Sequence, residues 1–212
     1  MIRVPCEQGS VEWSKARSGI PTASAFHRII TPATGRLSAQ ATGYIHELVA
    51  ERILGVSMDQ VVSEWAERGR EMEESARTYY ETQRDIDVDR VGFCLRDDRR
   101  AGCSPDGLVG DDGGLEIKCP SAPVHVSYVL GEAGAKYRCQ IQGSLWVTGR
   151  EWWDFLSYNP AMRSIVVRFE RDEEFIEKLA SAVDEFTERL DKAMAEMVEK
   201  GYAAQETAVV PF

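Results

Sequence analysis

The feature that most constrains the fold of this chain is a Gly- and Asp-rich tract between two apolar segments. Residues 110–114 read Gly-Asp-Asp-Gly-Gly and separate Ala101–Val109 from Leu115–Cys119. Gly and Asp favour tight turns, and short apolar segments on both sides of such a turn are typical of paired strands. The sequence therefore predicts a β-hairpin that brings the two segments side by side.

Charged residues mark this hairpin as a candidate active site. Asp106 lies in Ser-Pro-Asp-Gly, and ten residues later Glu116-Ile-Lys118 follows the turn. Glu116 and Lys118 point to one face of a strand, because strand side chains alternate. Carboxylates favour Mg²⁺ or Mn²⁺, so Asp106 and Glu116 are predicted metal ligands. The set suits metal-assisted phosphodiester hydrolysis, although a solvated hairpin with an edge-strand lysine fits the same residues.

Lys118 has two roles to choose between in such a site. It either deprotonates the attacking water or positions it. A lysine ammonium is protonated at pH 7 unless its surroundings lower its pKa, so positioning is the role we expect.

Length and composition indicate one domain without a membrane span. We place a single domain at residues 1–212, with a core over about 10–170 and a C-terminal amphipathic helix over about 171–199. No apolar stretch approaches the roughly 18–20 residues that cross a bilayer, and no signal-peptide pattern is visible. Five cysteines without a Cys-x-x-Cys pair argue against a disulfide framework or a zinc site. These features predict a protein of the reducing cytoplasm.

The net charge of −10 by itself argues against a nucleic-acid partner, because proteins that bind DNA are usually basic. Two considerations weaken that argument. Bound metal offsets the charge of active-site carboxylates, and much of the acid lies between Glu170 and Glu199. A DNA path needs only a local basic patch. The candidate side chains for that patch are Arg17, Arg28, Arg36, Arg68, Arg70, Lys136 and Arg138.

Apolar periodicity predicts alternating helices and strands along the chain. The expected helices cover residues 10–18, 22–31, 44–54, 58–83 with a break near Gly69, 135–148 and 171–199. The expected strands cover residues 88–95, 101–109, 115–119, 152–158 and 164–169, and residues 31–43 are expected to form a loop. This order predicts an α/β fold with a central mixed β-sheet flanked by helices.

Several further segments accompany the hairpin in a fixed order. They are Trp13-Ser-Lys-Ala-Arg17, Thr22-Ala-Ser24, Gly69-Arg-Glu-Met-Glu-Glu-Ser-Ala-Arg-Thr78, Gln140-Ile-Gln-Gly-Ser-Leu-Trp-Val-Thr148 and Phe155-Leu-Ser-Tyr-Asn-Pro-Ala-Met-Arg163. Together with the hairpin, these segments closely resemble the phage lambda exonuclease family, the viral-recombinase alkaline exonucleases of the PD-(D/E)xK nuclease superfamily. The resemblance runs from about Trp13 to about Met197, and it implies a restriction-endonuclease-like core.

The resemblance also implies an activity and an assembly. Such an enzyme would use Mg²⁺, two ions per active site, with Mn²⁺ as a substitute. It would degrade one strand of linear double-stranded DNA from the 5′ end, release 5′-mononucleotides and leave a 3′ overhang. Related enzymes are ring-shaped homotrimers that cooperate with a single-strand annealing protein in recombination. The resemblance further implies a phage or prophage protein that works in the cytoplasm of a bacterial host.

Residue roles follow from the same resemblance. Asp106, Glu116 and the backbone carbonyl of Ile117 would hold the metal, and Glu73 would hold metal-bound water from the far side. Its neighbours Glu71 and Glu74 are the competing candidates for that position. Gln140 would be the supporting amide, bonded to water, phosphate or the site lysine, whereas Gln142 would face elsewhere on the same helix.

The resemblance also assigns residues to the DNA end. Arg17 aligns with an arginine that grips the 5′-terminal phosphate, and Ser24 aligns with a phosphate-contacting hydroxyl. Ser24 fits a helix cap nearly as well. The family places an apolar wedge residue where this chain has the small Ala66, and Trp65 is a candidate substitute.

Two other classes of function stay open at this point. A PD-(D/E)xK endonuclease of the restriction or repair type would cut closed circular DNA, which an enzyme that starts at ends cannot do. A DNA-binding module of the same fold without catalysis would lack turnover, and the intact set of Asp106, Glu116 and Lys118 argues against it.

Overall fold

The computed structural model of the chain describes residues 1–32, 34–58 and 64–204, with only the backbone described for residues 64–71. The helices are α1 (Val11–Arg17), the 3₁₀ helix η1 (Ala23–Arg28), α2 (Ala41–Leu54), α3 (Glu64–Arg84), α4 (Ala122–Val129), α5 (Glu132–Thr148) and α6 (Glu173–Glu199). In the part of the chain so described, no helix is both long and apolar enough to cross a membrane.

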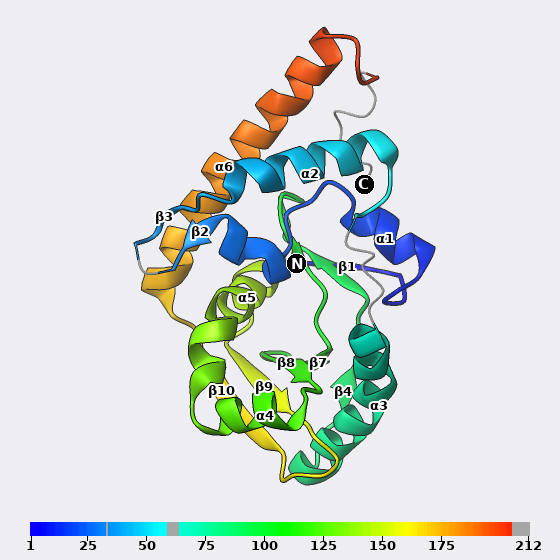
Figure 1. The fold of residues 1–212 in the computed structure, drawn as a ribbon, viewed down its shortest axis with the longest axis vertical. Helices are drawn as coiled ribbons and strands as arrows, with labels where there is room; N and C mark the ends of the chain where they lie inside the picture. The colour runs from blue at the N-terminus through cyan, green and yellow to red at the C-terminus, as the bar shows by residue number, and fades with distance from the viewer. Residues whose placement is uncertain (33, 59–63, 205–212) are drawn as a thin grey trace.

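The strands form one large sheet and two small ones (Figure 1). They are β1 (Ile2–Val4), β2 (Ile30–Thr31), β3 (Arg36–Leu37), β4 (Val88–Asp89), β5 (Phe93–Leu95), β6 (Gly102–Cys103), β7 (Gly107–Val109), β8 (Gly113–Lys118), β9 (Trp152–Ser157) and β10 (Ile165–Glu170). The large sheet has the order β10-β9-β8-β7-β4, and the small sheets are β1-β5-β6 and β2-β3. Strands β8 and β9 are parallel, and the other neighbours in the large sheet are antiparallel. The predicted central mixed sheet is confirmed.

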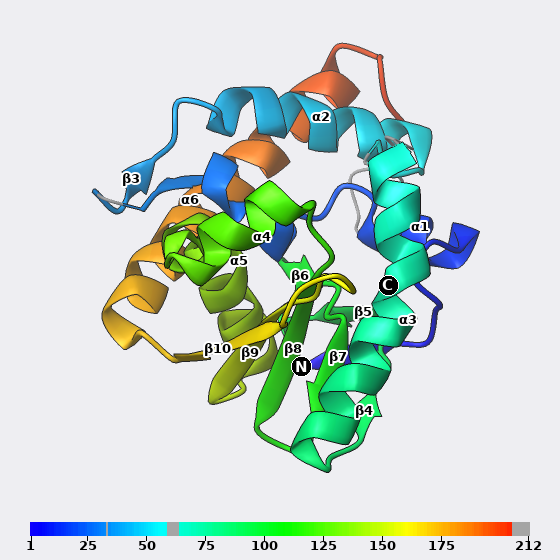
Figure 2. The same cartoon turned by 60° about the horizontal axis from the view of Figure 1, so that its bottom comes forward.

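Helices cover both faces of the large sheet, as Figure 2 shows. Helix α3 packs on one face through Ala76 and Tyr80, which contact a cluster that includes Leu115 and Ile117 of β8. Helices α5 and α6 belong to the larger core on the other side, together with Trp153 and Phe155 of β9. Alternation along β8 therefore sends Ile117 toward α3 and leaves Glu116 and Lys118 facing α5.

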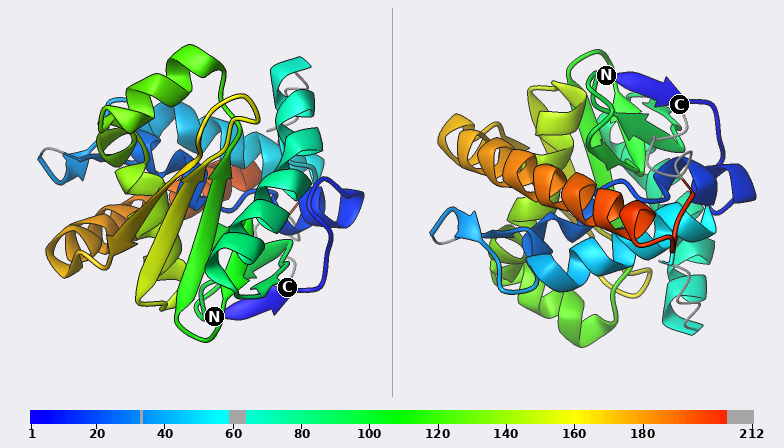
Figure 3. Two further views of the ribbon diagram at one scale, coloured as in Figure 1. Left: turned by 90° about the horizontal axis from the view of Figure 1, so that it is seen from below. Right: turned by 90° about the horizontal axis from the view of Figure 1, so that it is seen from above.

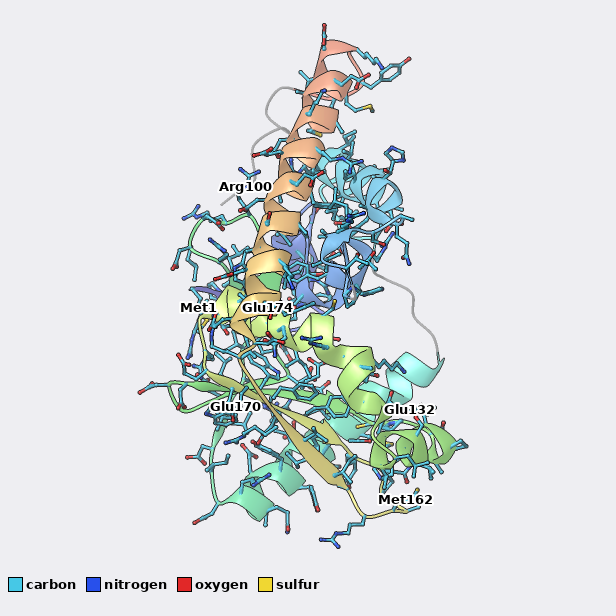
Figure 4. The ribbon with its side chains drawn as sticks, turned by 90° about the vertical axis from the view of Figure 1, so that its left-hand side faces the viewer. Met1, Arg100, Glu132, Met162, Glu170 and Glu174 are labelled. Carbon is cyan, nitrogen blue, oxygen red and sulfur yellow. The ribbon has the colours of Figure 1, made fainter. Side chains whose placement is uncertain are left out.

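The C-terminal helix forms where its apolar periodicity predicts. The side chains of Phe175, Leu179, Val183, Phe186, Leu190 and Met194 are all buried. Asp172 caps the helix, since its Oδ1 accepts a hydrogen bond from the amide of Phe175 at 3.1 Å. Figure 3 shows α6 lying beside α2, and Figure 4 shows it passing Arg100. The Arg100 guanidinium donates to Thr187 and Asp191 of α6.

Two predicted strands are each divided between two sheets. Residues 88–95 form β4 in the large sheet and β5 in a small one, and residues 101–109 divide into β6 and β7 in the same way. Gly92 lies at the first division, where a Cβ would stand 2.0 Å from the carbonyl oxygen of Cys6. Pro105 lies at the second, and proline has no amide to continue a ladder. The chain therefore leaves one sheet for the other immediately before Asp106.

Other predicted boundaries need correction. Residues 22–31 form a 3₁₀ helix followed by β2, and the predicted loop 31–43 contains β3 and the start of α2. Helix α3 runs through Gly69 without the predicted break, and the first residues of the predicted helix 58–83 lie partly outside the described residues.

Candidate active site

The site begins with the register of the hairpin. Gly107 of β7 pairs with Leu115 of the antiparallel strand β8. The preceding residue, Asp106, therefore falls opposite Glu116. Side chains at opposed positions of an antiparallel pair lie on one face, about 5 Å apart at Cβ. Asp106 is also held directly against β8, because its Oδ2 accepts a hydrogen bond from the amide of Ile117 at 2.6 Å. The structure thus brings the two predicted carboxylates together.

Glu116 is the buried centre of the candidate site, with 2% of its surface exposed. Its Oε1 accepts hydrogen bonds from the Lys118 ammonium and from Nε2 of Gln140, the latter at 2.6 Å. Gln142 faces away, as predicted, and bonds the backbone of Glu170 and Asp172. Gln140 therefore supports Glu116 in the structure, which differs from the predicted contact with water, phosphate or Lys118.

Burial and charge in the site raise the pKa values of Asp106 and Lys118. Burial, followed by repulsion from Glu116 and Glu73, raises the pKa of Asp106 to about 8, although Lys118 and the Ile117 amide oppose the shift. Burial disfavours the Lys118 ammonium, but attraction to Glu116 and Asp106 outweighs it and raises the pKa of Lys118 above its usual value. Lys118 therefore stays protonated at neutral pH, which favours positioning over proton abstraction as its role.

The donor set of the site fits a divalent cation. Among the described residues, Oδ1 of Asp106 and Oε2 of Glu116 accept no hydrogen bond, since only the other oxygen of each carboxylate is engaged. The Ile117 backbone lies between them, with its side chain in the α3 cluster. Two carboxylates and a carbonyl suit Mg²⁺, which keeps several of its waters. The raised pKa of Asp106 agrees with such a site, because the carboxylate is buried and is repelled by Glu116 and Glu73.

Glu73 approaches the site from α3 but does not join the carboxylates directly. In the described ranges, no group of three or more His, Cys, Asp or Glu side chains is arranged to hold a metal. Glu73 and Asp106 nevertheless both act on Cys119, whose thiol pKa is raised to about 11 by burial and then by these two charges. This placement is compatible with a contact through water. The competing Glu74 is more exposed and pairs with Arg90, and the side chain of Glu71 lies outside the described residues.

Arg77 is a site residue that sequence reasoning missed. Its Nη2 bonds Glu73 Oε1 at 2.5 Å, and its Nε and Nη2 donate to the carbonyl oxygen of Asp106 at 3.2 and 3.1 Å. The available signal was its spacing, because residues four apart on a helix are neighbours.

Tyr137 is a second residue that was missed. The Lys118 ammonium lies 5.6 Å from the centroid of its ring, which stacks on Phe155 at 4.8 Å. Its hydroxyl bonds that of Tyr128 at 2.8 Å, and Lys136 donates to Tyr128. Tyr137 stands one helical turn before Gln140 on α5, so helical spacing could have indicated it.

The segment before Asp106 is fixed to the N-terminal part of the chain. Gln8 donates to the carbonyl oxygen of Pro105 at 2.7 Å, and the Trp13 indole donates to Ser104 Oγ at 2.9 Å. The Arg17 guanidinium carbon lies 4.2 Å from the centroid of the Trp13 ring, and Arg17 is buried. A chain of contacts thus runs from Arg17 to the segment that carries Asp106.

Ser24 lies exposed in η1 and shares a 3.2 Å hydrogen bond with Thr22 Oγ1. The helix cap position is Thr22, so the competing interpretation of Ser24 as a cap is wrong. η1 packs closely on α5, since a Cβ at Gly143 would stand 2.4 Å from the Phe26 ring. Ser24 is thereby placed on the helix pair that also carries Gln140.

Two of the remaining basic candidates are paired with carboxylates. Arg28 makes a two-bond contact with Glu47, and Arg138 pairs with Asp172. The side chains of Arg68, Arg70, Ala66 and Trp65 lie outside the described residues.

Solved structures that resemble this chain include exonucleases. The alkaline exonuclease LHK-Exo of Laribacter hongkongensis is 31% identical, with a TM-score of 0.82 over 91% of this chain and 98% of that chain. Its complex with dAMP gives the same identity and coverage with a TM-score of 0.81. A phage related exonuclease from Haemophilus somnus 129PT shares the fold at 18% identity, with a TM-score of 0.68 over 84% of this chain and 96% of that chain.

Sequence comparison identifies a related protein and a family. The protein ExoD of Escherichia coli (strain K12) is 36% identical over 64 residues, which are 29% of this chain and 74% of that protein. Residues 12–151 match the YqaJ-like viral recombinase domain. The predicted kinship with the lambda-exonuclease-type nucleases and the predicted PD-(D/E)xK fold are therefore confirmed. This chain belongs to the family of the YqaJ-like viral recombinase domain, and its fold is that of the alkaline exonucleases.

Proposed function

We propose that this chain is a Mg²⁺-dependent exonuclease that degrades one strand of linear double-stranded DNA from its 5′ end. The observation that carries the proposal is the convergence of Asp106, Glu116 and Lys118 on one face at the ends of β7 and β8. Membership of an exonuclease family supports the reaction class. Strand direction and metal choice are the parts that experiment has to test.

In this proposal Asp106 and Glu116, with the carbonyl of Ile117, hold the metal ions. Bound Mg²⁺ supplies Lewis-acid activation of the phosphodiester and of water. Lys118, kept cationic by Glu116 and Asp106, orients the attacking water and attracts the scissile phosphate. Gln140 fixes the Glu116 carboxylate, so that its second oxygen keeps one direction. Glu73 orders water on the α3 side of the site.

We assign recognition of the 5′ end to Arg17, with Ser24 as a second phosphate contact. A guanidinium can bond two oxygens of a phosphate at once, which lysine cannot do. The stack of Arg17 on Trp13 limits its freedom and links it to Ser104, two residues before Asp106. LHK-Exo has been crystallised with dAMP, a 5′-mononucleotide of the kind that we propose as the product. The other strand would remain as a 3′ overhang.

We further propose a closed homotrimer that encloses duplex DNA and works with a single-strand annealing protein, in the cytoplasm of a bacterial host. A chain of net charge −10 cannot hold a polyanion by overall charge, so sustained digestion requires enclosure or a focused basic channel. Closed cyclic symmetry is the usual arrangement of homo-oligomers. We choose three subunits because the chain resembles a family whose enzymes are homotrimers.

The test is digestion of three DNA substrates with Mg²⁺ and with EDTA. They are a linear duplex with 5′-phosphates, the same duplex with 5′-hydroxyls, and a covalently closed circle. The proposal expects digestion of the linear duplexes only, faster with 5′-phosphates, and none in EDTA. Cutting of the circle would identify an endonuclease, and binding without cutting would identify a non-catalytic module.

A further inference from the structure

One buried guanidinium connects two parts of the site that come from different layers of the fold. Arg77 lies on α3 and has 7% of its surface exposed. Its Nε and Nη2 donate to the backbone carbonyl of Asp106, and Nη2 also bonds the carboxylate of Glu73. No other described side chain bonds both of these residues.

The geometry of these bonds restrains position as well as charge. Asp106 follows Pro105 at the point where the chain enters the large sheet, so it has only a short strand after it to hold its backbone. Two N–H groups of one planar guanidinium converge on its carbonyl oxygen. A lysine could make one such bond but could not span Asp106 and Glu73 together. Arg77 thereby sets the distance between α3 and the Asp106 backbone.

Arg77 is itself held in place from the outer side. Its Nη1 bonds Glu74 at 2.9 Å, and Glu74 is bonded in turn by Arg90. Arg77 also places a cation on the α3 side of a site that holds Glu73, Asp106 and Glu116. Lys118 is the cation on the opposite side.

We propose that Arg77 is a positioning residue that fixes Asp106 and Glu73 in the separation required to bind the divalent cations. This inference rests on the proposed function of the site. Among the described contacts, Arg77 bonds neither Oδ1 of Asp106 nor Oε2 of Glu116, and it acts through the backbone of Asp106 and the carboxylate of Glu73. Loss of Arg77 should therefore weaken metal binding and turnover while leaving DNA binding intact.

The experiment compares Arg77→Met and Arg77→Lys with Arg84→Met, a control on the exposed end of the same helix. Mn²⁺ binding is measured by electron paramagnetic resonance on the DNA-free protein, and kcat and KM are measured on 5′-phosphorylated linear duplex. A small displacement of a catalytic group can cost about 100-fold in rate, so we expect Arg77→Met to lose about 100-fold in kcat with KM for DNA unchanged. Mn²⁺ binding should weaken in parallel, and Arg84→Met should match the wild type.

The two variants at position 77 separate position from charge. Arg77→Lys keeps the charge but not the geometry of the guanidinium. The positioning role would be overturned if either Arg77→Lys or Arg77→Met had the kcat and Mn²⁺ binding of the wild type. If Arg77→Met melts below the assay temperature, the test of the positioning role rests on Arg77→Lys. That variant must then lose kcat and Mn²⁺ affinity while its melting curve stays near that of the wild type. A wild-type protein that binds Mn²⁺ but does not digest DNA would instead contradict the proposed function.

Discussion

Asp106 should make the metal-free protein less stable as the pH rises from 6 to 8. Its pKa lies near 8 in the folded state, because burial and the charges of Glu116 and Glu73 disfavour the carboxylate. An exposed Asp in the unfolded chain has a pKa near 3.8. When the pKa of a carboxyl is higher in the folded protein than in the unfolded chain, the protonated group stabilises the folded state. This stabilisation is complete below the pKa of the unfolded chain and is lost as the pH rises through the pKa of the folded protein. Asp106→Asn removes this dependence and keeps an oxygen that can accept from the Ile117 amide.

The size of the effect follows from the two pKa values. Between pH 6 and pH 8 the folded protein changes from almost fully protonated to half protonated at Asp106, whereas the unfolded chain is ionised throughout. The linkage integral over that window is about 2 kcal/mol. Because Asp106 as a residue is only partly buried, we expect about 1–2 kcal/mol. The wild type should lose this much stability relative to Asp106→Asn.

The assay is urea unfolding of both proteins in EDTA at pH 6 and pH 8, at one protein concentration. All other titratable groups are common to both proteins, so their contributions cancel in the comparison. Addition of Mg²⁺ at pH 8 should then stabilise the wild type more than Asp106→Asn, because a ligand that binds only the folded state stabilises it. Equal pH dependence of the two proteins, within about 0.5 kcal/mol, would refute the charge account of the site.

Four further predictions concern activity and assembly. Asp106→Ala or Glu116→Ala should lower the rate of Mg²⁺-dependent hydrolysis at least about 10³-fold with the fold retained, measured by nuclease assay and circular dichroism, and near-normal activity would end the metal-site assignment. Lys118→Ala should still bind DNA in Ca²⁺ but fail to cleave it in Mg²⁺, whereas a joint loss would make Lys118 a phosphate anchor. Arg17→Ala should erase the rate difference between 5′-phosphate and 5′-hydroxyl duplexes, about 10–100-fold for a charge-assisted contact, and an unchanged ratio would remove Arg17 from the site. Light scattering on the DNA-free protein should give about three times the 23.7 kDa chain mass, and a monomer would rule out the ring.

The core of the site could be predicted because it depends on local rules. The turn between the two strands was predicted at 110–114 and lies at 110–112, because β8 already begins at Gly113. Such a turn and a side-chain period of 2 are enough to bring Asp106 toward Glu116 and to align Glu116 with Lys118. The buried face of α6 follows in the same way from helical periodicity. Such features need no knowledge of distant contacts.

The features that escaped prediction depend on contacts between distant segments. The divided strands at 88–95 and 101–109 follow from the close approach of Cys6 to Gly92 and from Pro105. Helix α4 buries His125 and Tyr128 and exposes Val126 and Val129, so its apolar pattern gives no signal. β1 is only three residues long and is held by its pairing with β5.

The role of Arg77 could not be predicted from the sequence for a related reason. In an acidic helix, an arginine four residues after Glu73 resembles an ordinary surface ion pair, and only the fold shows that it also bonds the Asp106 carbonyl. Tyr137 was missed for the same reason, because its contact with Lys118 joins helix α5 to strand β8.

The measurement that tests the central claim most directly is the identity of the first product released from an end-labelled linear duplex. One strand is labelled at its 5′ end and, in a parallel substrate, at its 3′ end, and single-turnover digestion is followed in Mg²⁺ with the wild type and with Glu116→Gln. We predict early release of the 5′ label as a mononucleotide, late release of the 3′ label, and no release by Glu116→Gln. Early release of the 3′ label, a labelled internal fragment, or full activity in Glu116→Gln would contradict a 5′-end exonuclease site built on Asp106, Glu116 and Lys118.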